Sequence, residues 1–217
     1  MSAPFRTLRR RAEVAASLAG LLLVVGCVPS QRLTFVGDSI TAAGPWQAAY
    51  PHRVVSNQGV PGDRASDVLT RLEQVKATRA DLYLVMVGIN DLRSGVPVEQ
   101  VAAQIGEIRQ RLLQGASPLP RVVVLSTLRC RPTPMNGCTE AVQEAVAELN
   151  RRLAAQAPRG AFLDLNPGMA PDGLLAKAYT EDGIHLTVAG YRRWQELLAP
   201  LVIGLDMEGH APTPDSR

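Results

Sequence analysis

The feature that most constrains the fold of this 217-residue chain is an alternation of short apolar runs with longer stretches of helical periodicity. Residues 81–88 (DLYLVMVG) are apolar almost without interruption, which is typical of a strand buried on both faces of a parallel sheet. Four other runs of strand length lie at 32–37, 53–59, 121–126 and 161–165. Because parallel neighbours need a crossover connection, the alternation predicts an α/β fold, a three-layer α/β/α sandwich around a five-stranded parallel sheet.

The stretches between and after these runs repeat apolar residues three and four positions apart, as amphipathic helices do. Helices are therefore expected at 65–77, 97–113, 139–156 and 187–202. Thr187 precedes the last of them, where its hydroxyl is suited to act as the N-cap.

The first 26 residues have the composition of an export signal. Four arginines precede an apolar run at 14–25, which is shorter than the roughly 20 residues that cross a bilayer core. The run closes with LVVGC, ending at Cys27, and resembles the lipobox of bacterial lipoproteins. We therefore expect a signal peptide at 1–26, a lipidated Cys27 and a location in the cell envelope, either periplasm or cell surface; a plain cleaved signal and an uncleaved anchor are the alternatives. One domain is expected at 27–204, followed by a polar, disordered tail at 205–217.

The charge of the expected mature chain argues against a nucleic-acid partner. The whole chain holds 23 basic and 20 acidic residues, and the leader accounts for four and one of them, which leaves 19 of each. A nucleic-acid surface needs a basic patch on the folded domain, and no dense run of lysine and arginine remains.

Besides Cys27, the chain holds two cysteines, Cys130 and Cys138, in the segment CRPTPMNGC. In an exported protein such a pair favours a disulfide, which would stabilise the fold by roughly 2–3 kcal/mol. Free thiols are the alternative, and two cysteines without a nearby histidine are too few ligands for a metal. The segment follows a predicted strand, so we expect it to form a stiff wall of the substrate cleft, with reduction affecting substrate binding more than the chemical step. The alternative is a bond that only stabilises the fold.

Polar residues and glycines cluster where the first three predicted strands end. Ser39 follows the first strand, Gly59 closes the second and Asn90 follows the third. Asp182 and His185, in an Asp-x-x-His arrangement, directly precede the last helix. Because the carboxyl ends of parallel strands meet at one edge of the sheet, these residues are expected to converge there.

Four short motifs, in order, resemble the blocks of the SGNH hydrolase superfamily, also called GDSL esterases and lipases. They are GDSI at 37–40, NQG at 57–59, GIND at 88–91 and DGIH at 182–185. Each block alone is weak, but four in order at predicted strand ends are specific. The one departure is the conservative Ile40, where the family usually has leucine.

This resemblance implies a flavodoxin-like fold and a serine esterase. Ser39 would be the nucleophile, His185 the base and Asp182 the residue that orients the imidazole. The oxyanion donors would be the backbone N–H groups of Ser39 and Gly59 and the side-chain amide of Asn90. No metal or cofactor is implied.

The resemblance leaves the substrate open among lipid acyl, short-chain and O-acetyl esters, including those on glycans. Acyl transfer to an envelope glycan would use the same residues, and a non-catalytic glycan- or lipid-binding protein is the other alternative. We expect a monomer that contacts the membrane through Cys27.

Several residues beside the motifs are expected to support the site or to pack around it. Asp38 and Asp91 are expected to bond to loop N–H groups. Asp63 and Arg64 are candidates for lining the pocket, and Trp46 and Tyr50 are candidates for the acyl pocket or for core packing.

Overall fold

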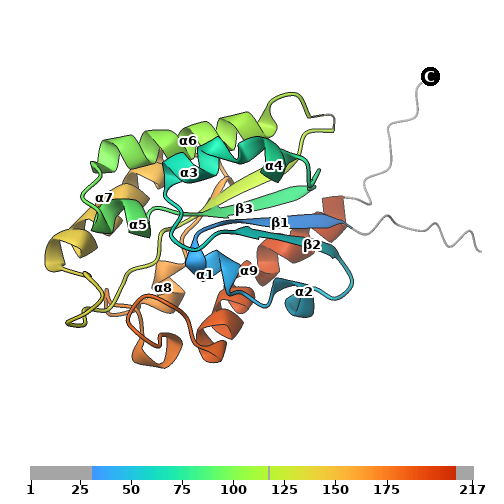
Figure 1. Cartoon of the computed structure of the whole chain (residues 1–217). Coiled ribbons are helices and arrows are strands. Elements are labelled where there is room, and N and C mark those ends of the chain that lie inside the picture. Colours follow the sequence, from blue (N-terminus) through green and yellow to red (C-terminus); the bar gives the residue numbers. More distant parts are fainter. Residues whose placement is uncertain (1–30, 117, 209–217) are drawn as a thin grey trace, which may run out of the picture.

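The computed structural model describes residues 31–116 and 118–208, which form a single parallel sheet covered by helices on both faces (Figure 1). The five strands occur in the order β2-β1-β3-β4-β5, and every pair is parallel. Their bounds are β1 Arg32–Gly37, β2 Val54–Gly59, β3 Leu82–Met86, β4 Arg121–Leu125 and β5 Phe162–Leu163. The three-layer α/β/α sandwich with a five-stranded parallel sheet is therefore confirmed.

The helices divide between the two faces of the sheet. In Figure 1, α3 (Ala65–Thr70), α4 (Leu72–Lys76) and α6 (Val98–Leu113) lie above the sheet, and α8 (Asn166–Met169) and α9 (Val188–Glu208) lie below it. The remaining helices are α1 Ser39–Ala42, α2 Trp46–Ala49, α5 Ile89–Arg93 and α7 Glu140–Gln156, with a 3₁₀ turn at Lys177–Tyr179. The N-cap prediction is also confirmed, since the Thr187 hydroxyl accepts a hydrogen bond from Gly190 N at 3.1 Å.

Strand order places a topological switch point beside the first strand. The chain leaves β1 toward β2 on one side and later returns to β3 on the other, so the direction of winding reverses between β1 and β3. Gly37, at the carboxyl end of β1, is paired with Gly59 of β2 and with Met86 of β3. Ligands of open α/β sheets bind outside such a switch point, so the loops after these strands are positioned to form a site.

An aromatic cluster connects the first helix to the last one. The ring of Trp46 is 1% exposed and stacks on Phe35, with centroids 4.1 Å apart. Trp46 also packs edge-on against Trp194 of α9, with ring centroids 4.9 Å apart. Tyr191, also on α9, donates a hydrogen bond from its hydroxyl to Ile40 O at 2.7 Å. Trp46 is therefore part of the core and not of an acyl pocket, and the cluster holds α1 against α9.

The strand predicted at 161–165 is shorter, Phe162–Leu163, and two helices differ from those expected. The single helix predicted at 65–77 is two helices, interrupted at Arg71, where ψ is 16°. This is the residue whose guanidinium bonds to Asp63 and to two strand-end carbonyls. The last helix continues to Glu208, past the predicted domain end at 204, because a helix tolerates a single glycine such as Gly204 at a cost of about 1 kcal/mol.

The leader, Cys27 and residues 209–217 lie outside the described residues. Among the helices that are described, none combines the length and the apolar character needed to cross a membrane.

Candidate active site

Ser39 stands at the first position of α1, directly after β1. Asp38 is the N-cap of this helix, and its Oδ1 accepts a hydrogen bond from Ile40 N at 3.0 Å. The first N–H groups of a helix have no acceptor within the helix, so the backbone N–H of Ser39 is not used by α1 itself. Ser39 itself is partly exposed, while Asp38 is buried.

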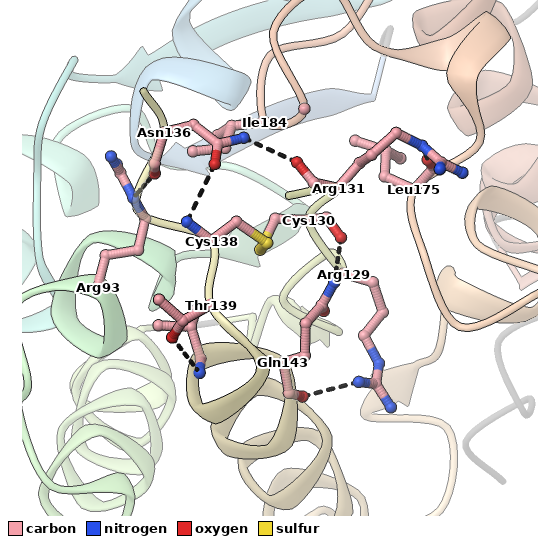
Figure 2. The surroundings of a disulfide bond; sticks show 12 residues. Arg93, Arg129, Cys130, Arg131, Asn136, Cys138, Thr139, Gln143, Leu175 and Ile184 are labelled. Atoms are coloured by element: carbon pink, nitrogen blue, oxygen red, sulfur yellow. Dashed lines mark hydrogen bonds between the residues drawn. A yellow bond between two sulfur atoms is a disulfide. The ribbon is translucent and has the colours of Figure 1, made fainter. Parts of the chain in front are cut away.

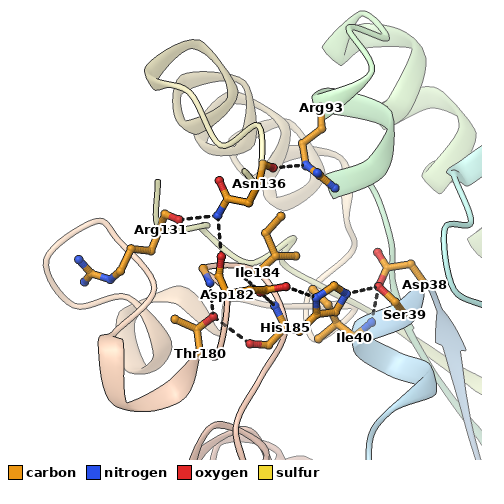
Figure 3. Close-up of polar contacts among 11 residues, drawn as sticks. Asp38, Ser39, Ile40, Arg93, Arg131, Asn136, Thr180, Asp182, Ile184 and His185 are labelled. Atoms are coloured by element: carbon orange, nitrogen blue, oxygen red, sulfur yellow. Dashed lines mark hydrogen bonds and ion pairs between the residues drawn. The ribbon is translucent and has the colours of Figure 1, made fainter. Parts of the chain in front are cut away.

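Ser39, His185 and Asp182 form a continuous chain of hydrogen bonds, although 146 residues separate the first two (Figure 3). Ser39 Oγ lies 2.9 Å from His185 Nε2. His185 Nδ1 lies 2.7 Å from Asp182 Oδ2. The structure therefore brings together the three residues that the sequence singled out as nucleophile, base and orienting acid.

The charge of Asp182 determines which ring nitrogen carries the proton. Burial alone would raise the pKa of Asp182, but hydrogen bonds from the His185 ring and from the backbone N–H groups of His185 and Ile184 outweigh it and lower the pKa to about 2. An ionised carboxylate can only accept, so His185 Nδ1 must donate to it. The Nε2 lone pair then faces Ser39 and can accept the hydroxyl proton.

The turn that carries Asp182 and His185 is closed by its own hydrogen bonds. Thr180 Oγ1 donates to His185 O at 2.8 Å and accepts from Gly183 N at 2.8 Å. Asp182 Oδ1 accepts from Ile184 N at 2.9 Å and from His185 N at 2.8 Å. We call residues 180–186 the acid–base turn. Both functional side chains are about half exposed, His185 at 44% and Asp182 at 52%, so the geometry depends on this backbone and not on burial.

The two other expected oxyanion donors lie at the ends of β2 and β3. Gly59 N donates to Asn57 Oδ1 at 3.0 Å. Asn90, in α5, donates from Nδ2 to Asp63 O at 3.0 Å, which uses one of its two amide hydrogens. A Cβ at Gly59 would lie 2.2 Å from Ala42 N, so only glycine allows β2 to approach α1 this closely.

A partly buried arginine, Arg71, lies next to this edge, and no sequence pattern indicated it. Arg71 Nε forms an ion pair with Asp63 Oδ2 at 2.7 Å, and its NH2 group donates to Gly37 O and Gln58 O at 3.2 and 2.8 Å. Asp63 is therefore a buried structural partner and does not line a pocket with its carboxylate. Because Asp63 O accepts from Asn90, the ion pair also holds the peptide that orients this amide. A basic residue within a helical stretch normally indicates a solvated face, which is why sequence patterning missed Arg71.

Two further buried carboxylates are structural, as expected. Asp91 accepts from Ala65 N through both of its oxygens, and burial raises its pKa to about 6. Burial likewise raises the pKa of Asp38 from its ordinary 3.8 to about 7, since its bond from Ile40 N and the nearby His185 offset only part of the desolvation.

This shift predicts a pH-dependent stability. Between about pH 4 and pH 7 folded Asp38 keeps its proton while the unfolded chain loses it, so the free energy of unfolding should fall with rising pH by about 4 kcal/mol from this group. Asp38→Asn keeps an N-cap side chain and should remove most of that decline. Denaturant unfolding of both proteins at pH 4 and pH 8 measures it. Burial also raises the pKa of Asp91, so part of the decline in the free energy of unfolding with pH should persist in Asp38→Asn. If Asp38→Asn shows the same decline as the wild type, the assignment to Asp38 is wrong.

No group of three or more histidine, cysteine or carboxylate side chains suited to hold a metal occurs in the described ranges 31–116 and 118–208. The arrangement of Ser39, His185 and Asp182 can activate a hydroxyl nucleophile with the chain's own residues.

The model of the GDSL-like lipase/acylhydrolase family matches residues 35–193, which include all four motifs. The chain belongs to this family. It is 32% identical over 197 residues to platelet-activating factor acetylhydrolase IB subunit alpha1 of Bos taurus, covering 85% of this chain and 82% of the relative. The Homo sapiens protein of the same name is 33% identical over 169 residues, 74% of this chain and 70% of the relative.

Solved structures show the same fold. A GDSL-like lipase from Bacteroides thetaiotaomicron superposes with a TM-score of 0.67 at 22% identity, covering 81% of this chain and 89% of that one. A catalytic mutant of an acetylxylan esterase from Geobacillus stearothermophilus superposes with a TM-score of 0.63 at 20% identity, covering 86% and 97%. The family membership and the acetylhydrolase relatives identify this GDSL family member as an ester hydrolase.

Proposed function

We propose that this GDSL-family hydrolase cleaves carboxylic esters through a triad of Ser39, His185 and Asp182. His185 Nε2 takes the proton of Ser39 Oγ as the oxygen attacks the ester carbonyl, and Asp182 stabilises the imidazolium that forms. His185 then donates this proton to the leaving alcohol, and a water activated by the same nitrogen hydrolyses the acyl-serine. The observation that carries the proposal is the hydrogen-bond chain of 2.9 and 2.7 Å from Ser39 to Asp182.

The negative charge of the tetrahedral intermediate would be stabilised by Ser39 N, Gly59 N and Asn90 Nδ2. Their support is position: α1, β2 and α5 all meet at the carboxyl edge of the sheet. The Gly59 N–H would have to leave Asn57 Oδ1 to serve the oxyanion, whereas the Asn90 amide has a second hydrogen besides the one bonded to Asp63 O.

The substrate we favour is an acetyl or other short-chain ester. The names of the acetylhydrolase relatives support this choice, since they cover most of the chain at 32–33% identity. The test is release of nitrophenol from p-nitrophenyl acetate by purified protein, with Ser39→Ala as the control. Activity no higher than that of the control would disprove the proposal, and a series of longer esters would show whether the preference is for short acyl groups.

We further propose that the enzyme works in the cell envelope with Cys27 lipidated. The support is the basic and apolar leader and the LVVGC segment that ends at Cys27. Labelling of expressing cells with radioactive palmitate tests this: label that persists in Cys27→Ser would refute lipidation at this residue.

A further inference from the structure

The loop between the two disulfide cysteines lies directly against the acid–base turn. Cys130 and Cys138 are bonded and buried, and the loop between them is mostly exposed, with Met135 at 93%. Asn136 is the exception, because its side chain is 6% exposed and turned inward (Figures 2 and 3). We call residues 130–138 the disulfide loop.

Asn136 uses every hydrogen-bonding position of its amide to join the loop to the turn. Its Nδ2 donates to Asp182 O at 2.9 Å and to Arg131 O at 2.8 Å. Its Oδ1 accepts from Thr133 N at 3.1 Å and from Cys138 N at 3.0 Å. One donor therefore holds the main chain of Asp182, and the other three contacts fix the amide within the disulfide loop.

A second contact locks the same two segments together. Arg131 N donates to Gly183 O at 2.7 Å. Gly183 has a φ of +92°, and a Cβ on it would lie 2.1 Å from Arg131 O and 2.4 Å from Asn136 Nδ2. The turn thus meets the loop backbone to backbone, at a position where only glycine fits.

The disulfide loop is in turn anchored to rigid elements. Asn136 O accepts from Arg93 Nε at 2.8 Å, and Arg93 lies on α5 three positions after Asn90. The Gln143 side chain of α7 donates to Cys130 O (Figure 2). The acid–base turn is therefore connected through Asn136 to the helix that carries a proposed oxyanion donor.

We propose that Asn136, held in place by the Cys130–Cys138 disulfide, is a positioning residue that keeps the acid–base turn aligned with Ser39. The proposal rests on the function proposed above for Ser39, His185 and Asp182. His185 and Asp182 are half exposed and have little packing of their own, so their alignment depends on the backbone that Asn136 holds. Loosening this backbone should slow the chemical step, because a displacement of about 1 Å in a reacting group can cost up to about 100-fold in rate. Disulfide reduction should then lower kcat, in contrast to the effect on substrate binding expected from the sequence.

The decisive variant is Asn136→Asp. It preserves size and the acceptor for Thr133 N and Cys138 N, but it replaces the donor by an oxygen that faces two carbonyl oxygens. We expect kcat for p-nitrophenyl acetate to fall about 10- to 100-fold with little change in KM. In the wild type we expect a downfield NMR signal from the His185 Nδ1 proton. In Asn136→Asp this signal should broaden or disappear.

Asn150→Asp is the matched control. Asn150 is also buried, and its amide donates to Thr127 O at 2.8 Å and accepts from Thr127 N at 2.9 Å, without contact to the acid–base turn. The same substitution there should reduce thermal stability by a similar mechanism but leave kcat within about twofold and the His185 signal intact. An equal loss of kcat in both variants would mean general loosening and would overturn the proposal, as would an Asn136→Asp enzyme with wild-type kcat and signal.

Two further measurements test the inference if the wild type is inactive or if Asn136→Asp does not fold. If the wild type shows no Ser39-dependent hydrolysis, the proposed function fails, and the His185 signal alone decides the positioning role: its survival in Asn136→Asp overturns the inference, and its selective loss there supports it. If Asn136→Asp does not fold, the wild type is measured with and without reductant at a temperature where both forms stay folded. A lower kcat in the reduced form supports the inference; a change in KM alone, or no change, overturns it and makes the loop a cleft wall or a structural link.

Discussion

Replacing Ser39 or His185 by alanine should lower kcat/KM for p-nitrophenyl acetate by about four to six orders of magnitude, and replacing both should cost scarcely more than either change alone. The reason is the 2.9 Å contact between Ser39 Oγ and His185 Nε2, which makes the two residues one proton-transfer unit. Without the imidazole the hydroxyl is a poor nucleophile, and without the hydroxyl the imidazole has no proton to accept. Asp182→Ala should cost less than either, because the carboxylate only orients and stabilises the base.

The measurement is a double-mutant cycle of wild type, both single variants and the double variant, with unfolding curves to show that all four fold. Losses that add in the double variant would contradict a shared mechanism. Residual turnover in Ser39→Ala close to the wild-type rate would mean that another group attacks the ester.

The strands were the most predictable part of the fold. β1, β3 and β4 are largely apolar because they are buried on both faces, and β1 was predicted at 32–37 and lies at Arg32–Gly37. Predicted helix boundaries were wrong where tertiary contacts outweighed local helix preference. The break at Arg71 depends on partners at Gly37 and Gln58, which are distant in sequence, and helical periodicity carries no information about them.

The proposed catalytic residues were predictable because Ser39 follows a predicted strand, while Asp182 and His185 form an Asp-x-x-His motif directly before the last helix, and such segments meet at the carboxyl edge of a parallel sheet. The residues that hold these side chains in place were not predictable from the sequence. Asn136 lies between prolines and a cysteine in a segment that indicates only a turn, and its contact with Asp182 O spans 46 residues. Arg71 and Tyr191 likewise act through backbone carbonyls, and any residue type supplies a carbonyl, so no sequence pattern marks the acceptor.

Replacing Asn90 by alanine should lower kcat by about 100- to 1,000-fold, the loss of roughly 2.7–4 kcal/mol that accompanies removal of one oxyanion donor. Asn90 Nδ2 donates one hydrogen to Asp63 O and has a second hydrogen for the oxyanion. The other proposed donor outside α1, Gly59 N, is already bonded to Asn57 Oδ1. The charge on the oxyanion exists only in the transition state, so KM should change far less than kcat.

Asn90→Asp is the matched variant, because it keeps the size of the side chain and removes the donor. A carboxylate beside the developing oxyanion should repel it, so this variant should lose at least as much kcat as Asn90→Ala. Both are assayed with p-nitrophenyl acetate after thermal unfolding shows an intact fold. If both variants lose stability while kcat stays within a few-fold of the wild type, Asn90 serves only to hold the Asp63 peptide, and the oxyanion is left to the backbone N–H groups of Ser39 and Gly59.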